Sequence, residues 1–260
     1  MILLAGWGRA ILLQLAHPLV AQGVAAHSDF LAEGWGRLWR LSRTLSAMLT
    51  LTFGTPEEVA AVARAINGIH DRVNGQLAVG QGPFPAHTRY TAHDPALLAW
   101  VHATLVDSLL LAYERFVAPL TAEERDRYCA ESTGIAPLLG IPPNYLPASV
   151  AELAAYMDAM LAGGEVAVTD TARALGREVV NPPAFLIGRP IVALARLPTV
   201  GLLPAGVREA YGFRWSARHQ RALDGLAATS RRLLPVLPSA LRHWPAARAA
   251  RVRSAPRRAG

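Results

Sequence analysis

The sequence predicts an all-α protein that folds as a single domain. Helix start signals recur along the chain, clusters of Pro and Gly separate them, and we find no alternating apolar and polar runs bounded by hairpin turns. A chain of 260 residues that is 52% hydrophobic is long and apolar enough to bury a sizeable core. No repeat of fixed period and no flexible linker divide it.

The clearest helix start is the stretch "GTPEE" at residues 54–58. Thr55 is placed to cap the first turn, Pro56 suits the first helical position, and Glu58 completes a capping box. We expect a long helix from here to about residue 79.

Further helix starts combine a capping side chain with a proline or a glutamate. They are Asp94 with Pro95, Thr121 with Glu124, and Ser149 with Glu152. The segments between them, such as "GQGPFPAH" and "GIPPNYLP", are typical of loops.

The apolar N-terminus does not have the pattern of a targeting segment. Arg9, Gln14 and His17 interrupt its first 26 residues, so we expect neither a signal peptide nor a membrane anchor. The longest uncharged run elsewhere, residues 132–151, contains four prolines and cannot form one continuous spanning helix.

The charge of the chain is concentrated at its C-terminal end. All 26 basic residues are arginine, and the eight after residue 230 face no acidic residue beyond Asp224. We therefore expect a folded domain at residues 1–245 and an arginine-rich disordered tail at 246–260. The body does not resemble a nucleic-acid reader. We expect the tail to be a solvated basic segment, with weak contact with an anionic membrane surface as the alternative.

Several chemistries lack their usual residues. The lone Cys129 excludes an internal disulfide and a CxxC site, which fits a cytoplasmic protein. The chain has no GxGxxG or Walker loop, no GxSxG elbow, and no HExxH or ExxH metal motif. Noncovalent haem held by one histidine stays open, because it needs only an apolar slot and an imidazole.

Four of the eight histidines lie in or beside apolar helical segments: His17, His27, His70 and His102. His70, in "INGIHDRVNG", borders the apolar stripe Val59, Val62, Ile66, Ile69 and Val73. His102 lies within "LLAWVHATLVDSLLLAY". From the residues alone, a structural core histidine is the favoured interpretation of each.

The stretch "GRLWRLSRTLSAMLTLTFG" places Arg40 and Thr44 four residues apart, on one face of a predicted helix. An exposed basic edge is the alternative reading of this polar stripe.

The order of these motifs resembles an oxygenase family. The succession is "LLQLAHPLVAQGVAAHSDF", Arg40-x-x-x-Thr44, "IHDRVNG" and "YTAHDPALLAWVHATLVDS". It is similar to the family that contains bacterial rubber oxygenase and the mycophenolic-acid-pathway oxygenase, over residues 8–245. The resemblance implies a globin-like helical bundle that holds haem b through a histidine in an H-x-x-V pattern, which His70 matches.

The same resemblance implies roles for other residues and also shows departures. Arg40 and Thr44 match a signature that lines the haem site, and His102 resembles a later buried histidine. The lysine that precedes the threonine in rubber oxygenase is replaced by Arg43, which is a poor metal ligand because it stays protonated. The arginines that flank the ligand histidine there are Asn67 and Asn74 here.

The function implied is that of a haem b-dependent oxygenase. It would act with dioxygen on a hydrophobic substrate, such as an isoprenoid alkene, with His70 as the iron ligand and Arg40, Thr44 and His102 around it. His17 and His27 are candidates for a general base by location alone. The alternative is a non-catalytic helical module that binds haem or a lipid.

Overall fold

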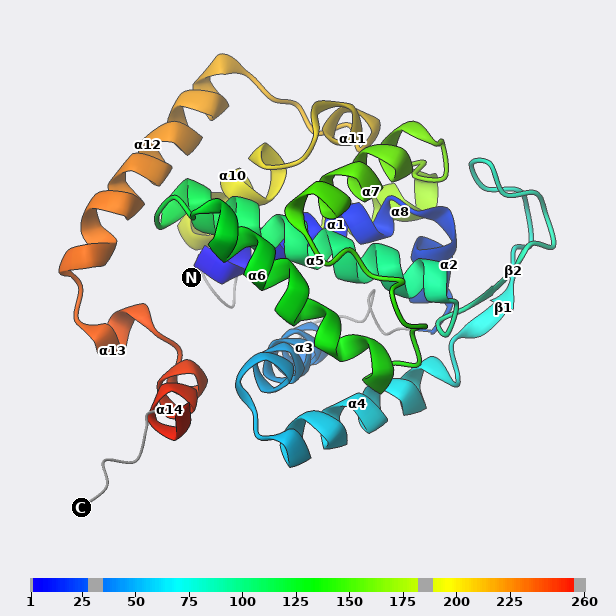
Figure 1. Ribbon diagram of the computed structural model, residues 1–260. Helices are drawn as coiled ribbons and strands as arrows, with labels where there is room; N and C mark the ends of the chain where they lie inside the picture. The colour runs from blue at the N-terminus through cyan, green and yellow to red at the C-terminus, as the bar shows by residue number, and fades with distance from the viewer. Residues whose placement is uncertain (1, 28–34, 182–188, 255–260) are drawn as a thin grey trace.

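The prediction of an all-α protein is confirmed by a computed structural model, which describes residues 2–27, 35–181 and 189–254 (Figure 1). The helices are α1 (Ile2–Leu15), α2 (Pro18–His27), α3 (Trp35–Phe53), α4 (Pro56–His70), α5 (Pro95–Phe116), α6 (Ala122–Ser132), α7 (Val150–Ala162), α8 (Asp170–Val180), α10 (Arg189–Gly201), α11 (Ala205–Ala210), α12 (Ala217–Leu233), α13 (Ser239–Arg242) and α14 (Pro245–Ser254). Two 3₁₀ segments, η2 (Thr133–Leu138) and η3 (Leu234–Val236), and two short strands complete the described elements.

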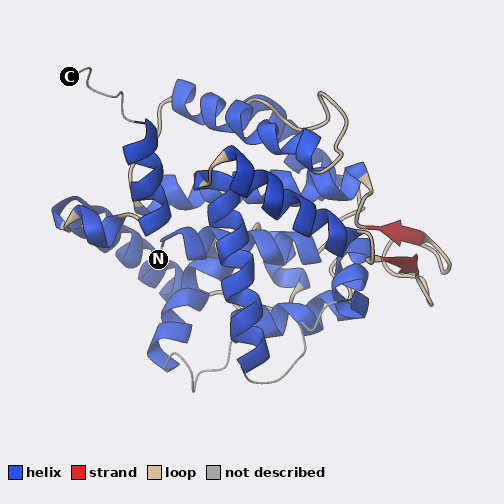
Figure 2. Ribbon diagram, turned by 90° about the horizontal axis from the view of Figure 1, so that it is seen from below, coloured by secondary structure: helices blue, strands red, loops and turns tan. Residues whose placement is uncertain are grey.

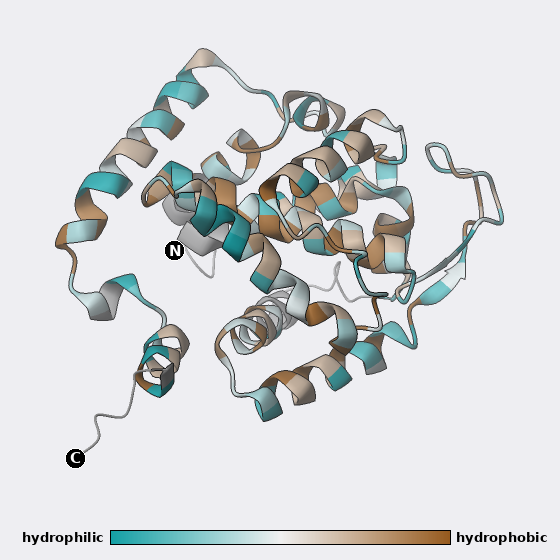
Figure 3. Ribbon diagram, viewed as in Figure 1, coloured by the Kyte–Doolittle hydropathy of each residue, from teal (hydrophilic) through white to brown (hydrophobic). Residues whose placement is uncertain are grey.

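The core of the bundle surrounds α5. This helix packs along α1 and also contacts α6, α7 and α12. Ala99, Trp100 and Ala103 of α5 are fully buried, as are Leu12 and Leu13 of α1. In Figure 3 the inner helices are largely brown, whereas the outer α6 and α12 carry many hydrophilic residues. The apolar faces of the helices are thus turned toward one shared interior.

α5 is also long and apolar enough to cross a membrane. In its most apolar window, 56% of the residues are buried inside the protein, as expected for the central helix of a bundle. In the described residues, the segments Gly6–Leu15 and Pro18–His27 pass the same test as a pair, but they are bent by 99°. The bend lies at Pro18, which begins α2 because proline fits the first turn of a helix.

The predicted helix starts are confirmed. Thr55 and Thr121 each form a capping box with the glutamate three residues later. The Asp94 carboxylate accepts a hydrogen bond from the backbone of Ala96. Ser149 caps the backbone of Glu152, whose own carboxylate binds the Ala148 N–H in place of the Ser149 N–H. Local capping chemistry therefore defines where these helices begin.

The predicted extent of the helix after Thr55 is wrong at its C-terminal end. We expected it to reach about residue 79, but α4 ends at His70 and a short hairpin follows. β1 (Asn74–Gln76) pairs antiparallel with β2 (Arg89–Thr91), and the hairpin projects from the helical body (Figure 2). Strands of three residues are too short to show an alternating pattern, so the sequence did not reveal them.

The C-terminal region also differs from the expected disordered tail. Residues 245–254 form α14, which lies against α3, and Arg253 donates a hydrogen bond to the carbonyl of Phe53. The segment "PAARAARVRS" is rich in Ala and Arg, which are among the best helix formers. Residues 255–260 lie outside the described part of the chain.

Candidate active site

His70 occupies the last position of α4, where the helix gives way to the hairpin. Its ring is partly buried, and its Nδ1 atom is shielded from solvent with no hydrogen-bond partner among the described residues. Burial lowers the pKa of His70, and nearby His93 lowers it further, although Asp71 opposes both effects. The imidazole is therefore held in its neutral form, in which a ring nitrogen can act as a ligand.

The stripe beside His70 is less buried than its pattern predicted. Ile69, expected on the inward face, is 45% exposed. Ala63 is the buried residue of α4. The last turn of α4 thus places His70 at the margin of the body and not at its centre.

The hairpin brings a second histidine to His70. The rings of His70 and His93 meet edge to face, with 5.7 Å between their centroids. His93 Nε2 lies 2.7 Å from Asp71 Oδ1, which fixes the orientation of the His93 ring. Sequence reasoning missed His93, because only the chain reversal between β1 and β2 makes it a neighbour of the α4 terminus, and it assigned no role to Asp71, which directly follows His70.

The two asparagines near His70 make different contacts. Asn67 Nδ2 donates to the carbonyl of Leu138, at 2.9 Å, and its Oδ1 atom is buried without a partner in the described structure. Asn74 Nδ2 donates to the carbonyl of Asp71, at 3.1 Å, within the turn. Asn67 therefore joins α4 to η2, whereas Asn74 stabilises the exposed turn after α4.

His102 lies on α5 and contacts the opposite end of η2. Its Nε2 atom is 3.0 Å from the carbonyl oxygen of Ser132, so Nε2 carries the proton and donates. Its Nδ1 atom is buried and unpaired among the described residues. Burial lowers the pKa of His102, and the bond to Ser132 partly offsets this.

The segment η2 thus links α4 and α5, the two helices that carry His70 and His102. Its start follows Ser132, which binds His102, and its end is Leu138, which binds Asn67 of α4. Asn67 Oδ1 and His102 Nδ1 are also buried without partners in the described structure, as is His70 Nδ1 at the end of α4. Buried polar atoms are rarely left unpaired in a folded protein, so these atoms are open to a bond with a bound ligand or an ordered water.

The Arg40 and Thr44 signature falls on α3, which packs alongside α4 (Figure 1). Thr44 is exposed. The side chain of Arg40 lies outside the described residues. The structure therefore places this signature on the helix next to His70, and the contact of Arg40 with the site stays a prediction.

His17 and His27, named as general-base candidates by location, have local roles in the fold. His17 is 2% exposed, and its Nδ1 accepts the Leu19 N–H at the start of α2. Burial lowers the pKa of His17 to about 4. His27 is exposed, and its Nε2 lies 3.4 Å from the Tyr90 hydroxyl. Neither histidine contacts His70 in the described structure.

No group of three or more His, Cys, Asp or Glu side chains within residues 2–27, 35–181 and 189–254 could hold a metal ion. A haem group supplies four ligands of its own and needs one axial side chain. A lone imidazole such as His70 is compatible with that requirement.

Comparison with known families decides the class of the protein. Residues 1–232 match the family model described as "ER-bound oxygenase mpaB/B'/Rubber oxygenase, catalytic domain". The chain belongs to this oxygenase family. The match covers every helix from α1 to α11 and nearly all of α12, so the suggested resemblance is confirmed. No curated protein and no solved structure matches the chain.

Membership makes this helical domain an oxygenase catalytic domain, with a substrate and dioxygen as its partners. The residues around the α4 terminus fit a haem group on one specific ground. His70 presents a neutral, partly buried ring whose Nδ1 has no protein partner in the described structure, which leaves a nitrogen available for a ligand.

Proposed function

We propose that this family member is a haem b-dependent oxygenase in which the imidazole of His70 would hold the haem iron. The observation that carries the proposal is the unpaired, buried Nδ1 of a ring that burial keeps neutral. Haem, when bound, supplies the iron that activates dioxygen. The protein would supply the imidazole that holds the haem, its apolar surroundings, and the polar groups that orient haem and substrate.

The neighbouring residues have distinct parts in this proposal. The bond from His102 Nε2 to the Ser132 carbonyl fixes the orientation of the His102 ring, which therefore stays as a neutral imidazole beside η2. Arg40 and Thr44, on the adjacent α3, would orient a propionate or the oxygen substrate. Asn67 joins α4 to η2 through its hydrogen bond to the Leu138 carbonyl, and this contact positions the end of α4 that carries His70.

We propose a hydrophobic substrate, with an isoprenoid alkene as the first compound to test. The support is the family match together with the apolar composition of the body. The alternative, a module that binds haem or a lipid without turnover, differs in one measurable respect: it consumes no oxygen when an alkene is added to the reduced holoprotein.

The iron ligand is tested by reconstituting the purified chain with haemin. Visible spectra of the ferric, ferrous and carbon-monoxide forms and the iron content per chain are recorded for the parent and for His70→Ala. We expect His70→Ala to lose haem. His27→Ala is the matched control, because His27 is an exposed helical histidine, and it should retain haem.

Two further variants separate ligation from folding. His70→Gly should regain a Soret band when imidazole is added, because free imidazole replaces the missing axial group. His102→Ala should disturb the site at a cost of about 1–3 kcal/mol, through the lost bond to Ser132, while keeping residual haem. Full haem occupancy in His70→Ala, or loss of haem in His102→Ala alone, would refute the ligand assignment.

A further inference from the structure

A cavity lies apart from the α4 terminus, between the C-terminal half of α10 and the segment that enters α12. Its volume is about 550 Å³, within the range of small-molecule sites. It is lined by Arg196, Leu197, Val200, Gly212, Arg214, Trp215 and His219. None of the helices that carry His70 or His102 contributes to this lining.

The lining of this cavity is positively charged. Two guanidinium groups, of Arg196 and Arg214, face it, and no acidic side chain lines it among the described residues. Arg196 donates to the neutral amide of Asn181, at 3.3 Å, and neither arginine forms an ion pair within the described chain. Glu209 lines a smaller adjoining hollow that shares Arg214 and Trp215 with this cavity, but no ion pair joins Glu209 to Arg214 in the described residues. Both charges therefore remain available to an anion.

The opposite wall is aromatic and rigid. The ring of His219 stacks on Trp215 with 5.3 Å between centroids, and Arg208 lies over the Trp215 ring at 5.1 Å. Trp215 Nε1 also donates to Gln220 Oε1, at 3.1 Å. These contacts hold the indole in a fixed position at the wall of the cavity.

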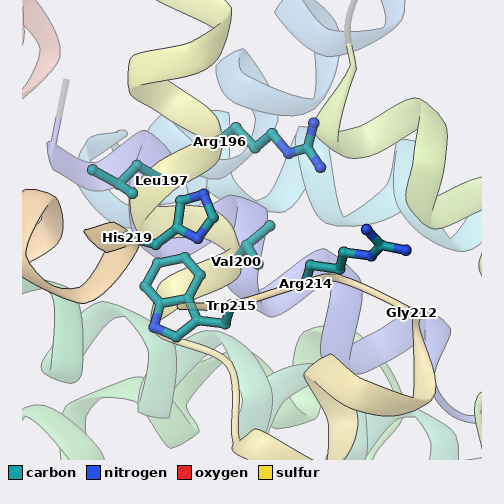
Figure 4. A pocket seen from close by; sticks show the side chains of 7 residues that line it. All are labelled: Arg196, Leu197, Val200, Gly212, Arg214, Trp215 and His219. Carbon is teal, nitrogen blue, oxygen red and sulfur yellow. The ribbon is translucent and has the colours of Figure 1, made fainter. Parts of the chain in front are cut away.

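His219 contributes a hydrogen-bond donor to the cavity. Its Nδ1 accepts the backbone N–H of Ser216 at 3.2 Å, so the neutral ring carries its proton on Nε2. Figure 4 shows the Trp215 and His219 rings on one side of Val200, with the Arg196 and Arg214 side chains extending away on the other. Cationic and apolar surfaces are thus separated across one cavity.

We propose that this cavity binds an organic anion in which a phosphate or carboxylate is joined to an aromatic or apolar group. The anionic end pairs with Arg196 and Arg214, whose planar guanidinium groups suit both oxyanions. The apolar end lies against Trp215 and Val200. The proposed site does not involve haem, so its test is independent of the test of the proposed oxygenase activity.

The proposal is tested by calorimetric titration of the full chain with phenyl phosphate, benzoate, inorganic phosphate and phenol. Phenyl phosphate or benzoate should bind about tenfold more tightly than inorganic phosphate and phenol, since only they engage both walls. The stronger of the two identifies the preferred oxyanion. Trp215→Phe, which retains an aromatic ring, should remove most of the change in tryptophan fluorescence on binding, although the chain has six tryptophans.

Charge-matched variants distinguish a specific site from general attraction to a basic protein. Arg196→Gln/Arg214→Gln should weaken binding at least about tenfold, because the oxyanion loses its charge-assisted hydrogen bonds to both guanidinium groups. Arg231→Gln/Arg232→Gln removes the same charge from exposed positions at the far end of α12 and should leave the affinity unchanged. Circular dichroism confirms that each variant is folded.

Three outcomes would overturn the proposal. If both double variants weaken anion binding equally, the binding depends on the net charge of the protein and not on this cavity. Binding of phenyl phosphate and benzoate no tighter than that of inorganic phosphate would exclude a role for the aromatic wall. An unchanged fluorescence response in Trp215→Phe would place the ligand elsewhere on the chain.

Discussion

Arg9 offers the sharpest test of how the bundle is held together. It lies on α1 and is 5% exposed, yet it carries a full charge. Its guanidinium bonds to three groups from two other parts of the chain: Nε donates to the Leu202 carbonyl at 2.7 Å, and Nη1 donates to Asp107 at 2.6 Å and to Ser108 at 2.7 Å. One side chain thus fastens α1 to α5 and to the residue that follows α10.

Replacing Arg9 with Met keeps the length and apolar stem of the side chain but removes the charge and all three bonds. Removing one partner of a buried pair typically costs about 3–5 kcal/mol. The Asp107 side chain is 31% exposed and can be partly hydrated once Arg9 is gone. We therefore expect the free energy of unfolding to fall by about 3 kcal/mol, the lower end of this range. For a chain of this size, about 3 kcal/mol corresponds to a fall of roughly 6–12 °C in the melting temperature.

The matched control is the pair formed by Arg115 and Asp224, whose side chains are 35% and 50% exposed. Arg115→Met should lower the free energy of unfolding by no more than about 1 kcal/mol, because water screens this pair. Urea denaturation at pH 7, with helicity followed by circular dichroism, measures both variants. If Arg9→Met is no more destabilising than Arg115→Met, the reasoning about burial is wrong.

Two other predictions concern stability. Because the His17 pKa is about 4 in the fold and about 6.5 when unfolded, the unfolded chain takes up the proton first. The stability is therefore complete above about pH 6.5 and falls by about 3 kcal/mol toward pH 4, a loss that His17→Asn should abolish in urea titrations at several pH values. Gly176→Ala places a Cβ atom 2.7 Å from Tyr211 Cε1 and should cost about 1–3 kcal/mol. Gly206→Ala meets nothing within 4 Å and should stabilise by about 0.4–1 kcal/mol, so a lower melting temperature for Gly206→Ala would contradict the packing argument.

Sequence patterns predicted the helix starts well because capping is local. The bonds of Thr55, Thr121 and Ser149 join groups no more than three residues apart, so the necessary chemistry is visible in a short window. The all-α class follows from the repetition of such windows. The end of α4 was missed because the expected helix was extended through Asn74 and Gly75, a pair that favours a turn, and because the hairpin strands are only three residues long.

Sequence periodicity also indicated His70 and His102 as partly buried histidines, and motif order indicated the family. The unpaired state of their Nδ1 atoms could not be predicted, because it depends on what packs against each ring. His102 lies 30 residues from Ser132, and Asn67 lies 71 residues from Leu138. These distances in sequence are closed only when α4, α5 and η2 come together.

The chain alone therefore determined its helix starts, its class and its family, since these depend on side chains within one or two turns or on the order of motifs. The tertiary structure decided which side chains meet: His93 with His70 through a hairpin, Arg9 with Asp107 across 98 residues, and two arginines with a stacked Trp215 around one cavity. The physical reason is that burial, desolvation and pairing are properties of the packed helices and not of any segment by itself.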